Sequence, residues 1–415
     1  MSGRLILLFL LLSCQNVLAQ DSVRVRSTLD ELCSDRLAGR GYVAGGDRKA
    51  ARFLRKAFQT AGLSTLPGNT WFQAFYFSVN SFPGPVSLKI DGKSLVPGRD
   101  FLVSPQSPSI KGTYTLRNGL EKTESCNASN TPKPWMLFDT TGTGISFSRK
   151  QADSLRNCMH AAGNLWTTGT KLTWSVSQKQ DRIPEIVVVD SVFPHNPSRM
   201  EVRIRSQFKK QHKARNVIGY LPGTGNCDSA LFITAHYDHL GRMGREAVFR
   251  GANDNASGVS MLLELAHWFS EPENRPRHDL VFVAFAGEEA GLIGSKHFVE
   301  SDWYPLQRIR FLLNLDLLGG GEEGLMVVNA TIHPTEFQLL KELNDSLNLL
   351  PDLRQRGPAA NSDHHWFAQS GVPAFFTYTL GGSKAYHDIY DNPNQLSLKA
   401  FNNCHRLFRL FLTGL

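Results

Sequence analysis

The chain has 415 residues, of which 41% are hydrophobic and 20% charged, and its formal net charge is +8. The length exceeds that of a usual single domain, and this balance of residues is ordinary for a globular protein, which argues against a disordered chain. The positive charge could suggest nucleic acid, but the basic residues at 203–215 begin by alternating with apolar ones, like a solvated strand face. No nucleic-acid module accompanies them, so we expect no nucleic-acid partner.

Residues 1–19 have the features of a secretory signal. Arg4 precedes the apolar run LILLFLLL, and the sequence VLA at 17–19 offers a small-residue cleavage site. The run is too short to span a bilayer, and no other segment could do so, hence no transmembrane segment is expected. We therefore expect an exported protein, periplasmic or extracellular. The alternative is a lipid anchor at Cys14, which ranks second because the bulky Leu12 precedes it.

Removal of the signal would leave five cysteines in a compartment that permits disulfides. Because the number is odd, at least one thiol stays unpaired unless it bonds another molecule. Cys126 with Cys158 is the expected pair, and the pairing of the others stays open: Cys33, Cys227 and Cys404.

The rest of the chain divides into regions that differ in their pattern of apolar and turn-forming residues. Residues 20–80 are interpreted as the N-terminal part of the main domain, with a helix from Asp47 to Gly62 whose apolar positions recur at helical spacing. Residues 81–200 carry short β-type runs broken by Gly, Pro and Asn, such as WMLFDT and EIVVVD. We interpret them as a β-rich insert, and long loops on a single domain are the alternative. Residues 201–415 complete the main domain.

From residue 216 onward, strand-like and helical runs alternate, as in a doubly wound α/β fold. The expected strands are NVIGYL, ALFITA, LVFVAFA, FLLNLD, LMVVN and PAFFTY. Helices are expected after Gly258, from Phe337 to Leu347 and from Leu398 to Leu412. The expected fold class is α/β, a three-layer α/β/α sandwich around a mixed, mostly parallel sheet, with the β-rich insert attached.

Three of the expected strands lead into carboxylates or histidine. ALFITA leads to His236 and Asp238, LVFVAFA leads to Glu288 and Glu289, and FLLNLD ends at Asp316. In open α/β sheets the carboxyl ends of the strands face the ligand-binding crevice. Acidic groups after buried strands are costly unless they are solvated or compensated, and a metal ion supplies that compensation. Because the set contains no cysteine, it suits a borderline-hard metal such as zinc.

Other acidic residues and histidines follow in nearby loops. Asp254 lies in a Gly-rich connection beside the same crevice, and two later motifs, SDHHWF and AYHDIYDN, add Asp363, His364, His365, Tyr386, His387, Asp388 and Asp391. Each motif alone is more often structural than catalytic, but their joint placement favours a metal site. His239 and His267 are interpreted as non-ligands, the first in a turn and the second within a helix.

Taken together, AHYDHLG, GANDNASG, FAGEEAGLIGS, NLDLLG, SDHHWF and YHDIYDN resemble the di-zinc aminopeptidases of the bacterial leucyl aminopeptidase type. Glutaminyl cyclases and the transferrin-receptor ectodomain are relatives within that fold. The resemblance covers about 216–415 and the stretch 32–63, whereas 81–200 is only loosely similar to the protease-associated inserts of some members.

The resemblance implies a hydrolase of the metalloprotease class with two zinc ions. His236 and Asp316 would bind one ion, Glu289 and His387 would bind the other, and Asp254 would bridge them. The resemblance also implies a cis peptide bond after Asp254.

It further implies the catalytic groups. Glu288 would be the general base that takes a proton from a metal-bridged water and passes it to the leaving amine. Asp238 would orient His236, and Tyr386 would polarise the scissile carbonyl. The implied function is a secreted zinc-dependent exopeptidase that hydrolyses the N-terminal peptide bond of peptides with a free N-terminus.

Two other functions stay open on this scaffold: a glutaminyl cyclase-like transferase with a single zinc ion, and a non-catalytic binding protein. The intact ligand set favours the aminopeptidase. After the final histidine this chain has Asp388-Ile389-Tyr390 where many members have threonine and proline. We expect Asp388 to add negative charge to an acidic pocket that attracts a substrate ammonium. The preferred N-terminal residue and the oligomeric state stay open.

Overall fold

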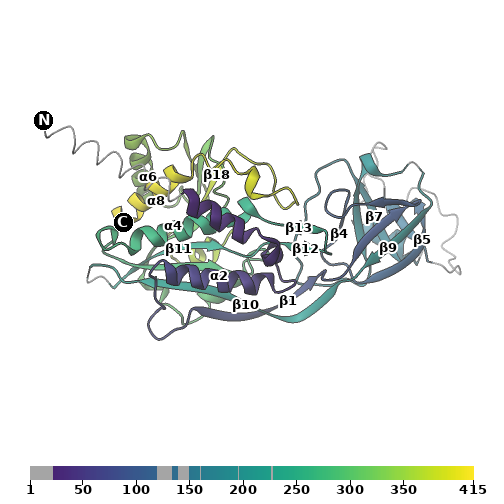
Figure 1. The fold of residues 1–415 in the computed structure, drawn as a ribbon, viewed down its shortest axis with the longest axis horizontal. Coiled ribbons are helices and arrows are strands. Elements are labelled where there is room, and N and C mark those ends of the chain that lie inside the picture. The colour runs from purple at the N-terminus through teal and green to yellow at the C-terminus, as the bar shows by residue number, and fades with distance from the viewer. Residues whose placement is uncertain (1–21, 119–132, 139–148, 159, 195, 226–227) are drawn as a thin grey trace.

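The computed structural model describes residues 22–415 except 119–132, 139–148, 159, 195 and 226–227. Two large sheets lie toward opposite ends of an elongated molecule, and most of the helices surround the first of them (Figure 1). The expected signal at 1–19 lies outside the described residues, as do Cys14 and Cys126. The side chain of Cys158 is not described either, so the expected disulfide stays a prediction.

The main sheet has the strand order β1-β10-β14-β11-β15-β18-β16-β17. Its strands are β1 (Phe72–Ser81), β10 (Gln207–Leu221), β11 (Ala230–His236), β14 (Asp279–Phe285), β15 (Ile309–Leu315), β16 (Gly324–Val328), β17 (Leu353–Arg356) and β18 (Ala374–Leu380). The central strands β14, β11, β15 and β18 run parallel, whereas β1 and β10 pair antiparallel at one edge and β16 is antiparallel to β18. All six strands expected after residue 216 are present.

Helices cover both faces of the main sheet. They are a helix at 22–32, α2 (Gly46–Thr60), α4 (Gly258–Ser270), α5 (Ile293–Val299), α6 (Pro334–Leu347), α7 (His364–Gln369) and α8 (Phe401–Gly414). Along β11, Leu231 and Ile233 pack into one core with α2, α4 and α8, while Phe232 packs into a second core with α5 and α7. This alternation, which follows from the two-residue period of a strand, confirms the three-layer α/β/α sandwich.

The second sheet has the order β3-β2-β9-β5-β6-β7-β8-β4. Its strands are β2 (Val86–Ile90), β3 (Lys93–Leu95), β4 (Phe101–Val103), β5 (Ile110–Asn118), β6 (Trp135–Phe138), β7 (Gly163–Thr168), β8 (Glu185–Val189) and β9 (Arg199–Ile204), and α3 (Arg149–Cys158) accompanies them. We refer to residues 86–204 as the second-sheet region. The long strands β1 and β10 lead from the main sheet toward it (Figure 1).

A short hairpin after β11 joins the two parts. It consists of β12 (Gly241–Met243) and β13 (Ala247–Phe249), and its apolar side chains belong to the core of the second-sheet region. The Phe249 ring stacks on Trp174 with centroids 4.7 Å apart. The second-sheet region is thus packed directly against the segment that follows the strand of His236.

Among the described residues, no helix is both long enough and apolar enough to cross a membrane. Cys33 and Cys404 are buried free thiols. Burial raises the pKa of Cys404 to about 12, which keeps this thiol protonated and unreactive.

Candidate metal centre

Three neighbouring strands of the main sheet deliver the predicted site residues to one edge. His236 is the last residue of β11 and is paired in register with Phe285, the last residue of β14. Asp316 directly follows β15, the other neighbour of β11. Because these strands are parallel, their carboxyl ends lie at the same edge, and polar side chains placed just after them meet there.

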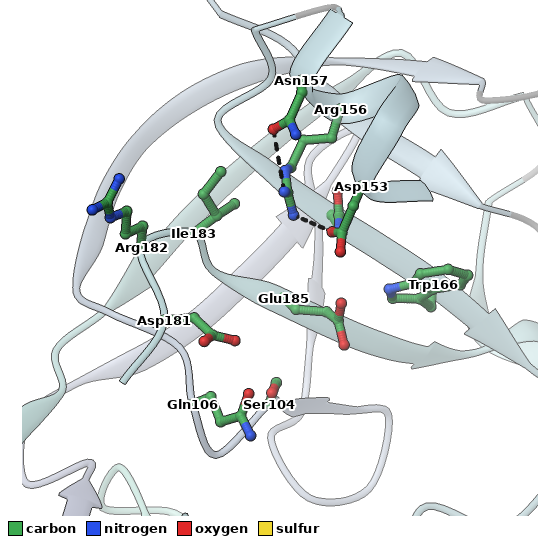
Figure 2. A pocket seen from close by; sticks show the side chains of 11 residues that line it. Ser104, Gln106, Asp153, Arg156, Asn157, Trp166, Asp181, Arg182, Ile183 and Glu185 are labelled. Atoms are coloured by element: carbon green, nitrogen blue, oxygen red, sulfur yellow. Dashed lines mark hydrogen bonds and ion pairs between the residues drawn. The ribbon is translucent and has the colours of Figure 1, made fainter. Parts of the chain in front are cut away.

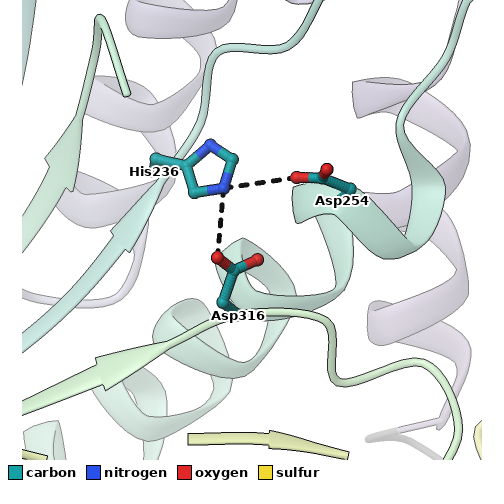
Figure 3. A group of neighbouring side chains, drawn as sticks. All are labelled: His236, Asp254 and Asp316. Atoms are coloured by element: carbon teal, nitrogen blue, oxygen red, sulfur yellow. Dashed lines mark ion pairs between the residues drawn. The ribbon is translucent and has the colours of Figure 1, made fainter. Parts of the chain in front are cut away.

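His236 lies between two carboxylates (Figure 3). Its Nε2 is 3.3 Å from Oδ1 of Asp254 and 3.4 Å from Oδ2 of Asp316. All three side chains are buried, and one potential ligand atom from each lies within 4.8 Å of the others. This arrangement places nitrogen and oxygen donors around a common point.

His387 forms a second group of the same kind. Its Nε2 is 3.1 Å from Oδ2 of Asp254 and 3.3 Å from Oε2 of Glu289. Asp254 therefore directs one carboxylate oxygen toward each histidine and lies between the two groups. The structure brings all five predicted metal ligands into this one cluster.

The loop around Asp254 is held by hydrogen bonds from several sides. It forms the irregular turn η3 (Ala252–Ser257) before α4, and the peptide bond between Asp254 and Asn255 is cis, as expected. The Asp391 carboxylate accepts the backbone N–H groups of Asn253 and Asp254 at 2.8 and 3.1 Å. The Asn255 amide donates to the Leu315 carbonyl at 2.9 Å, which ties the loop to the end of β15.

The charges of this cluster are suited to a cation. Asp254, Glu289 and Asp316 are buried together, and Oδ1 of Asp316 has no hydrogen-bond partner among the described residues. Burial raises the pKa of Asp316 above its ordinary value, and the nearby carboxylates of Asp254 and Glu289 add to this. Buried acids in such proximity need compensation beyond that of the histidines. The nitrogen and oxygen donor set therefore fits a divalent metal such as zinc.

Asp238 contacts the site through both its backbone and its side chain. The ring nitrogen Nδ1 of His236 is 3.2 Å from the Asp238 carbonyl oxygen and 4.0 Å from its carboxylate. The carboxylate instead accepts the Tyr42 hydroxyl and the backbone N–H groups of Glu288 and Glu289, the latter two at 3.3 Å. The carbonyl thus orients His236, whereas the carboxylate holds the turn that carries the two glutamates.

Glu288 and Tyr386 both line the cleft beside the cluster, whose volume is about 380 Å³. Burial raises the pKa of Glu288 well above its ordinary value, and the carboxylates of Glu289, Asp363 and Asp316 add to this effect despite the opposing charge of His236. The Tyr386 ring stacks on His387 with centroids 4.0 Å apart. Both side chains can therefore reach a molecule bound in the cleft.

His239, which was interpreted as a non-ligand in a turn, is buried beside the cluster, and the structure assigns no turn at this residue. Its Nδ1 lies 2.7 Å from Oε1 of Glu289, so it donates to the oxygen that faces away from His387. His239, Asp254 and Glu289 also form a group whose donor atoms lie within 4.8 Å of one another, so the interpretation of His239 as a non-ligand stays a prediction. The HYDH spacing could have indicated that His239 lies near the cluster.

The SDHH motif contributes a residue that the sequence analysis did not single out. The Ser362 hydroxyl donates to Oδ2 of Asp316 at 3.3 Å and accepts the Asn314 amide at 2.8 Å. His364 instead packs against Phe376, with ring centroids 5.2 Å apart. Burial lowers the pKa of His364 to about 3, so its ring is neutral.

The family model described as "Peptidase family M28" matches residues 216–412. We refer to these matched residues, which are similar to that family, as the M28 segment. The chain is 28% identical over 244 residues to a glutamate carboxypeptidase 2 homolog of Caenorhabditis elegans, which covers 51% of this chain and 30% of the relative. It is 36% identical over 122 residues to aminopeptidase YwaD of Bacillus subtilis, covering 29% of this chain and 25% of the relative. The matches thus span a third or less of either relative.

Solved structures share the fold over nearly the whole chain. BSAP, a zinc aminopeptidase from Bacillus subtilis, superposes with a TM-score of 0.69 at 18% identity and covers 94% of both chains. The aminopeptidase from Aneurinibacillus sp. strain AM-1 gives a TM-score of 0.61 at 22% identity, covering 94% of this chain and 92% of that one. At this coverage the likeness includes both the M28 segment and the second-sheet region.

Within the M28 segment, Asp388 does not add its charge to the cleft, so that expectation was wrong. Its Oδ2 lies 2.6 Å from Nζ of Lys171, which belongs to the second-sheet region, and its Oδ1 accepts the backbone N–H of Tyr390 at 2.8 Å. The loop after His387 turns this side chain toward the second-sheet region, where the lysine compensates its charge.

A second hollow of about 540 Å³ lies in the second-sheet region (Figure 2). It is separate from the cluster of the five predicted metal ligands, which we call the M28 cluster. Arg156 and Asp153 are paired in this second hollow at 2.5 Å, and Asp181, Arg182 and Glu185 also line it. Its described lining contains neither histidine nor cysteine, and acids and bases are mixed in it. This hollow therefore lacks the donor set that distinguishes the M28 cluster.

Proposed function

We propose that this protein is an exported aminopeptidase that uses two zinc ions to hydrolyse the first peptide bond of peptides with a free N-terminus. The observation that carries the proposal is the position of Asp254, whose two carboxylate oxygens face His236 and His387 at 3.3 and 3.1 Å. A carboxylate shared by two histidine-containing groups is suited to a pair of metal ions and has no evident use with one.

In this proposal His236 and Asp316 hold one ion, Glu289 and His387 hold the other, and Asp254 is shared. Two zinc ions bound there would polarise the peptide carbonyl and lower the pKa of an attacking water. The ligands themselves are held in place by His239 on Glu289 and by Ser362 on Asp316. Such supporting contacts fix the direction of each ligand atom.

Glu288 is the group that moves protons. Among the described residues it has no hydrogen-bond partner for its carboxylate, although it lines the cleft and lies directly beside Glu289. A raised pKa lies closer to neutral pH, and a general base works best when its pKa is near the pH of the reaction. Glu288 accepts the proton of the attacking water and then donates it to the leaving amine.

The cleft selects a positively charged group. Its described lining includes the carboxylates of Asp254, Glu288, Glu289 and Asp316 but no lysine or arginine. Apart from the proposed metals, the cleft therefore offers carboxylate oxygens and no competing side-chain cation of lysine or arginine to the ammonium of a free N-terminus. Holding that ammonium beside the metals places the first peptide bond next to Glu288, which restricts cleavage to the end of the chain.

Export is proposed from residues 1–19 alone, because their charged start and apolar run have the form of a secretory signal. N-terminal sequencing of the mature protein from a culture medium or periplasmic fraction tests this. A protein retained in the cytoplasm with Met1 intact would contradict it.

The activity is tested with an aminoacyl anilide and its N-acetylated form, with zinc content measured on the same protein. We expect two zinc ions per chain, cleavage of the free substrate, and no cleavage of the blocked one. Equal cleavage of both would indicate an endopeptidase or carboxypeptidase. One zinc ion per chain, with cyclisation of an N-terminal glutamine in place of peptide cleavage, would indicate a glutaminyl cyclase-like transferase.

A further inference from the structure

Lys171 of the second-sheet region binds the loop that carries His387. Lys171 Nζ donates to the backbone carbonyls of Lys384 and Tyr386, at 2.8 and 3.1 Å, in addition to its ion pair with Asp388. One lysine therefore binds the chain on both sides of His387. All three contacts cross from the second-sheet region to the M28 segment.

Trp174, three residues further on, contacts His387 itself. Its backbone N–H donates to the His387 carbonyl at 2.9 Å, and its own carbonyl lies 3.0 Å from Nδ1 of the His387 ring. Because a carbonyl can only accept, Nδ1 must carry the hydrogen. In the neutral ring this tautomer leaves Nε2, the nitrogen that faces Asp254 and Glu289, without a hydrogen and available to a metal.

Trp174 is in turn fixed by its side chain. The indole N–H donates to the Val103 carbonyl at 2.8 Å, and the ring stacks on Phe249 of the hairpin after β11. Trp174 is buried, so its backbone cannot shift without disturbing this packing. The carbonyl that orients His387 is therefore set by the core of the second-sheet region.

Two of the three residues that follow His387 contact the second-sheet region. Asp388 pairs with Lys171, and Ile389 packs against the core of the second-sheet region. At Gly98 an added Cβ would lie 2.8 Å from Cγ2 of Ile389, which shows how closely the two parts approach. These two residues thus create an attachment for the second-sheet region.

We propose that residues 171–174 are a positioning element for the metal site of His387, so that the second-sheet region completes this site from outside the M28 segment. The inference rests on the proposed function, since it concerns one of its two zinc ions. It predicts an asymmetry between the two sites. His236 is oriented by Asp238 within its own segment, whereas His387 depends on a contact made by residues more than two hundred positions upstream.

The test compares zinc binding by chelator competition in the full chain and in Lys171→Met. We expect one of the two zinc affinities to be unchanged and the other to fall about tenfold, which is the lower end of the range for loss of a contact that orients a ligand. Lys171→Arg should restore much of the affinity. Lys111→Met, which changes an exposed lysine on β5 of the same sheet, is the matched control and should leave both affinities unchanged.

Asp388→Asn supplies a second variant, because asparagine can still accept the Tyr390 N–H while it loses the charge paired with Lys171. The double variant Lys171→Met/Asp388→Asn should bind zinc no more weakly than Lys171→Met alone, since Lys171→Met already removes the ion pair with Asp388. The metal-free variants should unfold at nearly the wild-type temperature, which a merely structural role of Lys171 would not allow.

Two outcomes would overturn the inference, and they differ. If wild type binds two zinc ions and Lys171→Met retains both affinities, the positioning role is wrong while the proposed function stands. If wild type binds fewer than two zinc ions, the proposed function itself fails, and the inference fails with it.

Discussion

Replacing Glu288 by glutamine separates the general base from the metal ligands that surround it. Glutamine has nearly the shape of glutamate but cannot accept a proton from water at neutral pH. Because the Glu288 carboxylate has no hydrogen-bond partner among the described residues, this exchange breaks no contact that supports the fold. We therefore expect both zinc ions to stay bound and the fold to be unchanged.

The size of the effect follows from what is lost. A positioned general base contributes on the order of 10²- to 10⁴-fold to rate, which corresponds to about 3–5 kcal/mol of transition-state stabilisation. The backbone of Glu288 stays fixed by the Asp238 carboxylate at 3.3 Å, so substrate binding should change little. We expect kcat to fall by this factor while KM changes by less than about threefold.

The assay is steady-state cleavage of an aminoacyl anilide, with zinc content and the unfolding temperature measured on the same samples. Glu246→Gln, an exposed glutamate on the hairpin after β11, is the control and should have wild-type kcat. A Glu288→Gln protein with both zinc ions and near-normal kcat would refute the assignment of the base. Loss of zinc in this variant would instead show that Glu288 is a ligand.

Further variants test the neighbours of this residue and the fold that holds them. Glu289→Ala removes the carboxylate shared by His239 and His387, and zinc analysis should show lower occupancy, in contrast to Glu288→Gln. Tyr42→Phe removes the hydroxyl that donates to Asp238, and we expect urea unfolding to show a loss of about 1–3 kcal/mol. Arg40→Met leaves five backbone carbonyls without their buried guanidinium partner and should cost at least about 3 kcal/mol in the same assay. Burial and the charge of Arg409 lower the pKa of His405 to about 4 in the folded protein. Between pH 6.5, the ordinary pKa of histidine, and about pH 4, the unfolded chain therefore binds a proton at this ring that the folded protein does not bind. The neutral His405 ring therefore contributes its full stability above pH 6.5, and this contribution is lost as the pH falls toward 4. Between about pH 7 and about pH 5, the free energy of unfolding of the wild type should fall by about 2 kcal/mol more than that of His405→Gln.

The M28 part of the fold could be predicted because its signals are local. Each central strand is a short apolar run, and each helix repeats its apolar positions every three to four residues, so the elements could be located without knowledge of their partners. The rule that ligands bind at the carboxyl ends of parallel strands then brings His236 and Asp316 together. Asp254 and His387 lie in loops, and these two ligands were predicted from the resemblance of the motifs around them.

The directions of individual side chains could not be predicted in the same way. His239 contacts Glu289 from the segment after β11, which follows no periodic pattern that would give the direction of its side chain. Ser362 reaches Asp316 from a loop that contacts β15 only in the folded protein. These contacts depend on tertiary structure, which residue spacing does not encode.

Asp388 shows what this difference means for substrate binding. From its position after His387 we expected its charge in the cleft, but its partner Lys171 lies 217 residues earlier in the sequence and only 2.6 Å away in space. The negative charge of the cleft is therefore set by Asp254, Glu288, Glu289 and Asp316. Two bound zinc ions would balance the four negative charges of these carboxylates, so an ammonium would be held by individual oxygen atoms of the cleft and not by a net negative charge. Lys171 compensates the charge of Asp388 and also holds the loop that carries His387. Its loss would therefore change both the electrostatics and the geometry of this side of the site. Turnover would respond to either change, so zinc affinity must be measured as well.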